Sequence, residues 1–391
     1  MNTTPSSERL HIGFFGMRNA GKSSLVNAVT GQKLALVSDI KGTTTDPVKK
    51  AMELLPLGPV VIVDTPGLDD EGILGQMRVE RAKDTLSTVH IAVLVVNALR
   101  GMTIQDELLA SEIESRKLPL IIAMNKADLL DSVPENEGNK IYVSADKNMG
   151  INELKEKLAS LSGQVKNDKK ILADLVSKGD TIMLVTPIDE SAPKGRLILP
   201  QQQTIRELLE MGCVTLVVQA DEITDALANL KTAPKLVITD SQAFSQVEKL
   251  LPRNIKLTSF SILFARYKGD LDTVVQGAAK LSHLKDGDRI LISEGCTHHR
   301  QCKDIGTVKL PAWIKNFSGR DLYFTFTSGG EFPDDLKDFA LVVHCGGCTL
   351  NEKEMKSRLE KCAQQGVPVT NYGSAIAEMN GILRRSIEVF G

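Results

Sequence analysis

The sequence predicts an α/β fold with mostly parallel sheets, divided into three α/β domains. Short apolar runs of buried-strand length alternate with stretches of helical spacing along the whole chain. Strands that are covered by helices on both faces read as continuous apolar runs, which is typical of parallel sheets. The chain has 391 residues, which is more than one domain usually holds.

The first domain is expected at residues 1–168, and its end is marked by the polar stretch 162–170. A short apolar strand at its start is followed by a stretch with helical spacing that ends in glycine. The later apolar runs are long enough for buried strands and are separated by helical stretches. The strands of this domain are expected at 11–16, 59–64, 90–98, 118–126 and 140–145, with the first helix at 22–31.

Two further α/β domains are expected at 169–266 and 267–391. The middle one carries no recognisable phosphate loop, metal cluster or catalytic constellation, so we expect it to be a scaffold or dimerisation domain. The last one places cysteines just after two of its strands. The strands are expected at 181–187, 213–219, 235–240 and 257–264 in the middle domain, and at 288–295, 321–329, 339–347 and 367–372 in the last.

Composition and charge narrow the range of partners. The net charge of −2 gives no general attraction to nucleic acid or to membranes. No apolar run reaches the ~18 residues that a membrane-spanning helix needs. The amino-terminal residues lack the basic and apolar regions of a secretory signal. We therefore expect a cytoplasmic protein with neither nucleic acid nor membrane as a partner.

Residues 16–23, Gly-Met-Arg-Asn-Ala-Gly-Lys-Ser, fit the phosphate-loop pattern G-x-x-x-x-G-K-S/T between a predicted strand and a predicted helix. The backbone N–H groups of such a loop and the helix amino terminus favour bound phosphate. Lys22 is expected to reach the β- and γ-phosphates, and the Ser23 hydroxyl to bind Mg²⁺. The neighbouring Ala20, Gly21 and Ser24 complete the expected phosphate contacts.

Three further strand ends carry the companions of this loop. Asp64-Thr65-Pro66-Gly67 offers a carboxylate that reaches Mg²⁺ through water and a glycine N–H for the γ-phosphate. Asn125-Lys126-Ala127-Asp128 offers a carboxylate for two guanine N–H groups that adenine lacks. Ser144-Ala145 supports the base. Order and placement match translation-factor-type GTPases, so we predict a P-loop G domain that binds GTP and GDP.

Residues 36–47 resemble a switch loop in which one threonine completes the Mg²⁺ coordination. Thr44 is the first choice, with Thr43 and Thr45 as alternatives. The segment resembles the subfamily of bacterial tRNA-modification and ribosome-assembly GTPases. In that subfamily the asparagine that Asn19 matches helps to bind potassium, which adds positive charge at the phosphates. The alternative is a loop residue that satisfies its own backbone.

Leu68 stands where Ras-like enzymes have the glutamine that orients water. Leucine cannot orient water by hydrogen bonding, so we expect slow hydrolysis of GTP to GDP and phosphate. The acidic candidates that could help instead are Asp69, Asp70, Glu71 and Glu80. A slow GTPase is suited to act as a switch.

The last domain carries a C-x-H unit, Cys296-Thr297-His298, and an H-C-x-x-C unit, His344-Cys345-Gly346-Gly347-Cys348. In a reducing compartment such clustering indicates metal or redox chemistry rather than disulfides. Two centres remain open at this point. Zinc would take cysteine and histidine ligands. A [4Fe–4S] cluster would take three thiolates and leave one iron for an exchangeable ligand.

The combination of this G domain, an α/β segment and C-x-H…H-C-x-x-C resembles the HydF family of [FeFe]-hydrogenase maturation GTPases over the entire chain. The resemblance implies a dimeric scaffold that carries a [4Fe–4S] cluster. It also implies delivery of a diiron precursor, with its CO, cyanide and bridging ligands, to the apo-hydrogenase. Two radical-SAM maturases would act upstream.

The same resemblance implies that Cys296, Cys345 and Cys348 are the cluster thiolates. His298 and His344 are candidates for the fourth ligand or for groups behind the ligands. Cys302 and Asp304 are further candidates, and a fourth thiolate would close the cluster. The competing hypothesis is a zinc-containing GTPase that acts in RNA modification or ribosome assembly.

Overall fold

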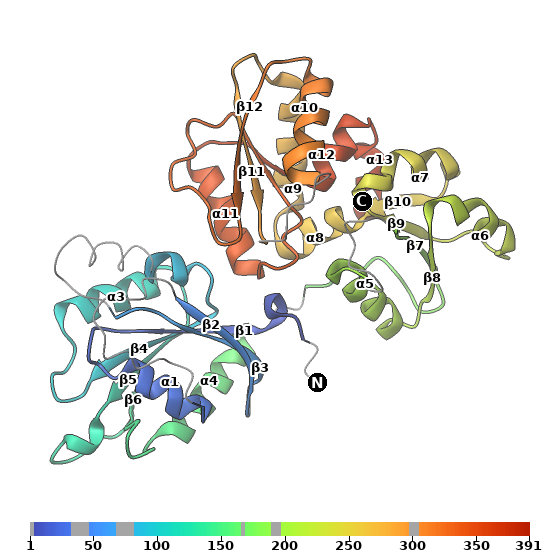
Figure 1. Cartoon of the computed structure of the whole chain (residues 1–391). Helices are drawn as coiled ribbons and strands as arrows, with labels where there is room; N and C mark the ends of the chain where they lie inside the picture. Colours follow the sequence, from blue (N-terminus) through green and yellow to red (C-terminus); the bar gives the residue numbers. More distant parts are fainter. Residues whose placement is uncertain (1–3, 33–46, 68–81, 166–168, 189–196, 297–304) are drawn as a thin grey trace. The chain divides into compact units, whose positions relative to one another are not determined.

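The computed structural model describes residues 4–32, 47–67, 82–165, 169–188, 197–296 and 305–391. The chain forms two compact units, residues 1–167 and 168–391 (Figure 1). We describe each unit by itself. In the part of the chain that is described, no helix is both long and apolar enough to cross a bilayer.

The first unit is built on a six-stranded sheet in the order β2-β3-β1-β4-β5-β6. All neighbouring pairs are parallel except β2 with β3. The main elements are β1 (Leu10–Phe15), α1 (Lys22–Thr30), β2 (Val48–Leu54), β3 (Gly58–Asp64), β4 (Ile91–Asn97), α3 (Ile104–Ser115), β5 (Leu120–Asn125), β6 (Lys140–Tyr142) and α4 (Ile151–Val165).

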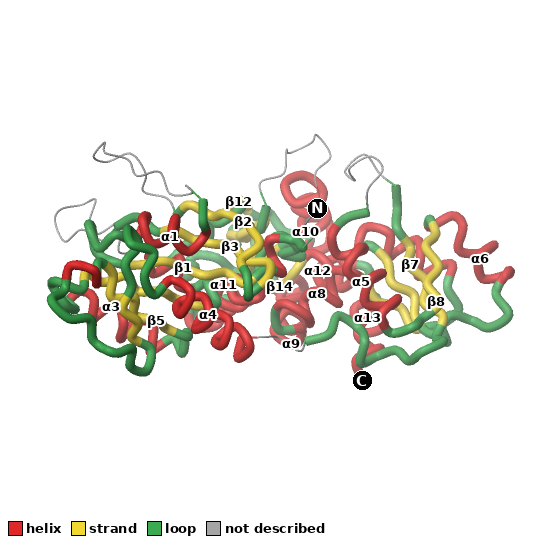
Figure 2. Tube along the Cα trace, turned by 90° about the horizontal axis from the view of Figure 1, so that it is seen from below, coloured by secondary structure: helices red, strands yellow, loops and turns green. Residues whose placement is uncertain are grey.

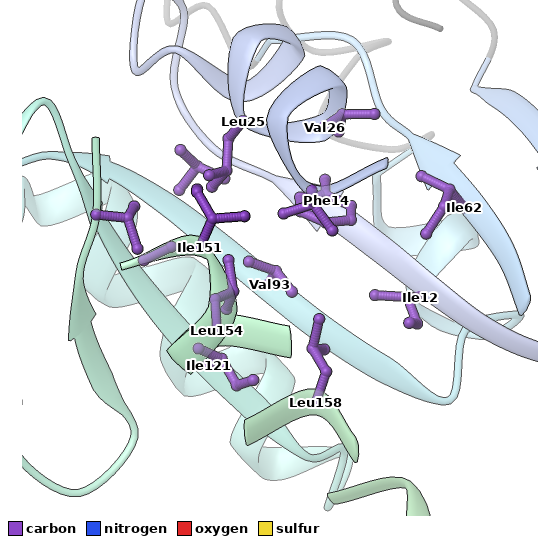
Figure 3. Packing of buried hydrophobic residues seen from close by; sticks show 14 of the residues in the cluster. Ile12, Phe14, Leu25, Val26, Ile62, Val93, Ile121, Ile151, Leu154 and Leu158 are labelled. Atoms are coloured by element: carbon purple, nitrogen blue, oxygen red, sulfur yellow. The ribbon is translucent and has the colours of Figure 1, made fainter. Parts of the chain in front are cut away.

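Helices cover both faces of this sheet, which explains its continuous apolar strands. On one face, Leu25 of α1 and Leu154 of α4 pack against Phe14, Val93 and Ile121 (Figure 3). A second apolar cluster fills the opposite face. The sequence pattern did not predict β2. Its residues are largely exposed at the sheet edge, so they show no apolar run.

The second unit contains two parallel four-stranded sheets, in the orders β10-β9-β7-β8 and β12-β11-β13-β14. Helices alternate with strands along both (Figure 2). The first sheet and its helices comprise β7 (Thr181–Val185), α5 (Leu199–Glu210), β8 (Val214–Val218), α6 (Ile223–Asn229), β9 (Leu236–Thr239), α7 (Phe244–Leu250), β10 (Lys256–Ser259) and α8 (Phe260–Lys268).

The second sheet of this unit follows directly along the chain. Its elements are α9 (Leu271–Ala278), β11 (Arg289–Glu294), α10 (Leu310–Ser318), β12 (Tyr323–Ser328), β13 (Leu341–His344), α11 (Glu352–Gln364), β14 (Val369–Asn371), α12 (Tyr372–Met379) and α13 (Leu383–Ile387).

One predicted strand, at 257–264, is wrong over its second half. The strand β10 ends at Ser259, and α8 begins at Phe260. The Ser259 hydroxyl accepts a hydrogen bond from the backbone N–H of Ile262, so this serine caps the helix. The apolar run continues across the junction because both elements are buried, and a run without periodicity does not separate strand from helix.

The end of the chain returns to the first sheet of the second unit. Ala377, Ile382 and Leu383 belong to the same apolar cluster as Met183 and Val185. Beside it, the buried Arg385 contacts Glu248 at 3.1 Å and donates to the Pro252 carbonyl at 2.9 Å. Residues beyond 266 therefore help to form the core around β7. The division into three domains stays a prediction.

Gly277 permits a close approach of α9 to β14. A Cβ at this position would lie 2.0 Å from the carbonyl oxygen of Val369. We expect Gly277→Ala to lower the free energy of unfolding of the second unit by ~1–3 kcal/mol, because the added carbon overpacks against backbone. Calorimetric unfolding of the full chain measures the change.

Gly163 of α4 is the matched control, because a Cβ there would meet nothing within 4 Å. Gly163→Ala should leave stability equal or raise it by up to about 1 kcal/mol, following helix propensity. Stabilisation by both substitutions would contradict the close approach of α9 and β14.

Candidate functional site

The predicted phosphate loop joins β1 to α1 in the first unit. Gly21 caps α1 in the left-handed region, with φ of 86°. A Cβ at Gly21 would lie 2.2 Å from the Asn125 amide nitrogen, and one at Gly16 would lie 2.3 Å from the carbonyl oxygen of Val95. Both positions therefore require glycine. Gly67 also lies against the loop, because a Cβ there would be 3.2 Å from the Arg18 Cα.

Lys22 and Ser23 meet Asp64, as strand pairing predicts. Phe14 of β1 pairs in register with Asp64 at the end of β3. The Lys22 Nζ lies 2.5 Å from one Asp64 carboxylate oxygen, and the Ser23 hydroxyl donates to the other at 3.4 Å. A carboxylate beside a hydroxyl supplies the oxygen ligands that Mg²⁺ prefers, so these residues fit the ion. Thr44 lies outside the described residues.

Asn125 connects three of the predicted motifs. Its side chain is 2% exposed. The amide nitrogen donates to the carbonyl oxygens of Ala20 at 3.0 Å and Gly21 at 3.3 Å. The amide oxygen accepts from the backbone N–H of Ala145 at 3.1 Å. The end of β5 thus holds the phosphate loop and the loop after β6 in fixed positions.

The remaining predicted residues of the first unit lie in these same loops. Lys126 adopts the left-handed conformation, with φ of 66°, and leads into the short turn that carries the half-buried Asp128. Ser144 is fully buried, and its hydroxyl accepts from the Lys147 N–H. Asn19 is exposed and left-handed, with φ of 64°, while Ser24 is half-buried.

The three predicted cluster cysteines follow neighbouring strands of the second unit. Cys296 comes after β11, and Cys345 and Cys348 come after β13, which pairs in parallel with β11. The Cys345 sulfur accepts hydrogen bonds from the backbone N–H of Gly295 at 3.0 Å and of Gly347 at 3.4 Å. We call residues 345–350 the cysteine loop.

In the absence of a bound metal, burial determines the protonation state of the Cys345 and Cys348 thiols. It raises the pKa of the Cys345 thiol to about 11, although two N–H donors oppose the shift. Burial also raises the pKa of Cys348, and the ammonium group of Lys268 opposes that shift. Both thiols are therefore protonated near neutral pH, and binding of a metal centre must release their protons.

His344 lies buried behind the cysteine loop with both ring nitrogens occupied. The Arg358 guanidinium donates to Nε2 at 2.9 Å, so Nδ1 carries the proton and donates to the Cys345 carbonyl at 2.8 Å. Burial, and then the charge of Arg358, lower the pKa of His344 to about 3. Arg358 is also paired with Glu354 at 3.0 Å. In this arrangement the imidazole is neutral and turned to its protein partners.

The thiols and amide donors fit an iron–sulfur cluster in their chemistry, since N–H groups directed at sulfur are a feature of such sites. Across the described ranges, no three His, Cys, Asp or Glu side chains gather closely enough to hold a single metal ion. A four-iron cluster binds each thiolate through a different iron, so it needs no such close group. His298, Cys302 and Asp304 lie outside the described residues.

The sequence patterns did not single out Lys268 or Arg358, whose side chains contact the cysteine loop and His344. Neither residue belongs to a recognisable motif, and each reads as one charge on a helix. Two further cysteines, Cys213 and Cys362, are buried in apolar clusters of the second unit, so they are core residues.

Comparison with family models matches all three segments of the chain. Residues 11–126 match the 50S ribosome-binding GTPase model. Residues 171–269 match the hydrogen maturase F dimerization domain, and residues 272–389 match the hydrogen maturase F tetramerization domain. The two maturase models together account for more than half of the chain.

Curated relatives match about half of this chain or less in the two examples that follow. A tRNA modification GTPase MnmE from Clostridioides difficile is 31% identical over 175 residues, which are 42% of this chain and 38% of that protein. A GTPase Der from Kosmotoga olearia is 29% identical over 230 residues, which are 52% of this chain and 50% of that protein. The chain thus spans half or less of these relatives' length.

Solved structures give weaker likenesses. A probable GTP-binding protein engB is 22% identical, with a TM-score of 0.33 over 39% of this chain and 99% of that chain. The G domain of the T. maritima FeoB iron transporter is 24% identical, with a TM-score of 0.29 over the same shares.

The phosphate loop, its companions at three strand ends and the matching family model define the first unit as a P-loop GTPase domain. With the two maturase models that cover the rest of the chain, the protein belongs to the HydF family of hydrogen maturases. The names of the two models support self-assembly of the chain.

Asn125→Ala should weaken GDP binding at least tenfold and lower the free energy of unfolding of the first unit by ~2–4 kcal/mol. The reason is that three hydrogen bonds of a buried amide are lost and their partners stay buried. Isothermal titration calorimetry and denaturant unfolding measure the two effects.

Asn97, which pairs in register with Asn125 at the end of β4, is the matched control. Its side chain accepts one hydrogen bond, from the Leu99 N–H in its own exposed turn. Asn97→Ala should keep GDP affinity within threefold. Equal losses in the two variants would remove the special role of Asn125.

Proposed function

We propose that this protein is a cytoplasmic GTP-binding and GTP-hydrolysing scaffold that assembles a diiron precursor and delivers it to an apo-hydrogenase of the [FeFe] class. The observation that carries the proposal is the presence of two constellations in one chain. The nucleotide residues gather at strand ends of the first unit, and the cysteines follow adjacent strands of a segment that matches a hydrogen maturase domain.

The G domain would bind guanine nucleotide at the carboxyl ends of its strands. Lys22 now pairs with Asp64, and a triphosphate offers this ammonium group more negative charge than one carboxylate does. We infer that Lys22 turns to the β- and γ-phosphates and frees Asp64 to hold the water shell of Mg²⁺ with Ser23. Thr44 completes the ion site and Asp128 accepts from guanine. The Gly67 N–H donates to the γ-phosphate.

Hydrolysis would be slow, because Leu68 cannot orient the attacking water. Asn19 is exposed within the phosphate loop, where a bound potassium ion would compensate the charge that develops on the phosphates. GTP then acts as a switch that biases the docking of partners rather than as a source of energy for bond chemistry. The partners would be the apo-hydrogenase and two radical-SAM maturases.

In the second unit, Cys296, Cys345 and Cys348 would hold a [4Fe–4S] cluster. When bound, the cluster supplies one iron that takes an exchangeable ligand. His298, with Cys302 and Asp304 as further candidates, would supply that ligand, and all three follow Cys296 in the sequence. The protein supplies the rest of the site: Gly295 and Gly347 donate to the Cys345 sulfur, and Arg358 keeps His344 directed to the Cys345 carbonyl.

Self-assembly would use the exposed edge of the first sheet of the second unit. The strand β8 lies at the edge of that sheet, within residues 171–269, which match a dimerization domain. Val214 and Val217 on this strand are 53% and 46% exposed, and Leu209 of α5 is exposed nearby in sequence. An apolar edge strand offers unpaired backbone groups to a second copy, so we propose a homodimer through β8.

Anaerobic iron and sulfide analysis with nucleotide titration tests the main proposal. The unaltered protein should bind GDP and hold about four irons per chain. Lys22→Ala should abolish nucleotide binding, because the ammonium group is lost, and should keep the iron. Lys83→Ala, at an exposed lysine of the same unit, is the control and should keep both.

Loss of iron in Lys22→Ala alone would argue against separate sites. One zinc per chain without iron would favour the competing function of a zinc-containing RNA-modification or ribosome-assembly GTPase.

Val214→Lys should shift the protein toward smaller assemblies, because a charge in an apolar strand-to-strand contact is desolvated without a partner. Sedimentation velocity measures the distribution of assemblies. Val133→Lys places the same charge at a 45% exposed valine of the first unit and should leave the distribution unchanged. An unchanged assembly in Val214→Lys would exclude β8 as the contact.

A further inference from the structure

A buried lysine reaches the cysteine loop from α8, the helix that follows the first sheet of the second unit. Lys268 is the last residue of α8 and is 2% exposed. Its ammonium group donates to the carbonyl oxygens of Cys348 at 3.2 Å and Leu350 at 3.0 Å. It also lies 5.7 Å from the ring centre of Phe264. Two carbonyls of the cysteine loop thus point at one enclosed positive charge.

Burial at this position carries a free-energy cost of desolvation for an ammonium group. Removing a charge from water costs several kcal/mol in a real protein, so a lysine is seldom buried merely to fill space. The Phe264 ring beside the ammonium group belongs to an apolar cluster, together with Phe260 and Leu263 of the same helix. An apolar side chain of similar length would pack there without that cost, so the charge itself calls for an explanation.

The hydrogen bond to Cys348 also fixes the direction of a peptide group. In a trans peptide the carbonyl and the following N–H point in opposite directions. The Cys348 carbonyl points to Lys268, so the N–H of Thr349 in the same peptide group points away from the lysine. Lys268 therefore holds this peptide group of the cysteine loop in one orientation, directly after the Cys348 side chain.

We propose that Lys268 is a positioning residue that pins the cysteine loop and raises the reduction potential of an iron–sulfur cluster bound there. This inference rests on the proposed function. A four-iron cluster on three thiolates is an anion in its oxidised form and gains one more negative charge when it accepts an electron. A nearby buried cation stabilises the reduced form more than the oxidised form.

The arrangement links two segments of the chain. Lys268 lies within residues 171–269, which match the dimerization domain, whereas the three cysteines lie within residues 272–389. The chain passes close to α11 directly after Lys268, since a Cβ at Gly269 would lie 3.1 Å from the Leu359 side chain. The electrostatics of the cysteine loop are therefore set partly by a residue outside its own sheet.

The test compares Lys268→Met with the unaltered full-length protein after anaerobic reconstitution with iron and sulfide. Methionine keeps the length and apolar stem and removes the charge. The readout is a redox titration with dithionite, a one-electron reductant, followed by EPR. No bond forms or breaks in this step, because one electron enters the cluster. Lys285→Met is the control. Lys285 is exposed and lies before the amino-terminal end of β11, whereas Cys296 follows the carboxyl end of that strand.

At the midpoint potential of the unaltered protein, Lys268→Met should show at least a tenfold shift toward the oxidised form. For a one-electron couple this equals about 59 mV. Lys285→Met should shift less than threefold. In the metal-free proteins, amide hydrogens of residues 346–351 should exchange faster in Lys268→Met alone. An unchanged potential in Lys268→Met overturns the inference.

If Lys268→Met retains no cluster, Lys268→Arg decides the question. Retention with a potential near that of the unaltered protein supports the role of the charge. If Lys268→Arg also fails to retain the cluster, Lys268 is required for packing rather than for its charge, and the inference is overturned. Absence of iron and sulfide in the unaltered protein overturns the proposed function itself, and the two failures are thereby distinguished.

Discussion

The parallel pairing of buried strands is the constraint on which both candidate sites depend. Every strand of a parallel sheet delivers its carboxyl end to the same edge. In the first unit this places the phosphate loop, Asp64 and Asn125 in contact, although more than a hundred residues separate Ala20 from Asn125. In the second unit the same geometry places Cys296 and Cys345 after neighbouring strands. The candidate functional side chains are polar or reactive, and in the sequence they directly follow the apolar strand segments.

Much of this could be predicted from sequence because the underlying signals are local. The phosphate loop needs glycines at fixed positions, and the strands that lead to Asp64 and Asn125 are continuous apolar runs. The strand β2 was missed because its largely exposed residues form no such run. The end of β10 was misplaced because a burial signal continues into α8. Lys268 and Arg358 could not be found at all, since their roles come from partners that lie 80 and 14 residues away along the chain.

Three buried cations hold the second unit together in a common way. Lys268 binds carbonyls of the cysteine loop, Arg358 binds the Gly329 carbonyl and His344, and Arg385 binds the Pro252 carbonyl. Each reaches from a helix to a segment distant in sequence, and carbonyl dipoles offset part of its desolvation cost. Arg358 and Arg385 also pair with carboxylates on helices, Glu354 and Glu248. The loops that carry reactive residues are thus fixed by charge as well as by apolar packing.

The return of the chain end to the sheet around β7 affects the order of folding during synthesis. Domains generally fold as units from the amino terminus as the chain emerges. The last strand of the first unit, β6, ends at Tyr142 and its last helix, α4, ends at Val165, so this unit can fold early. The core around Met183 and Val185, by contrast, includes Ile382 and Leu383. Its last contacts form only after residues 382 and 383 have been synthesised, and until then the hydrophobic surface beside β7 lacks the residues that cover it.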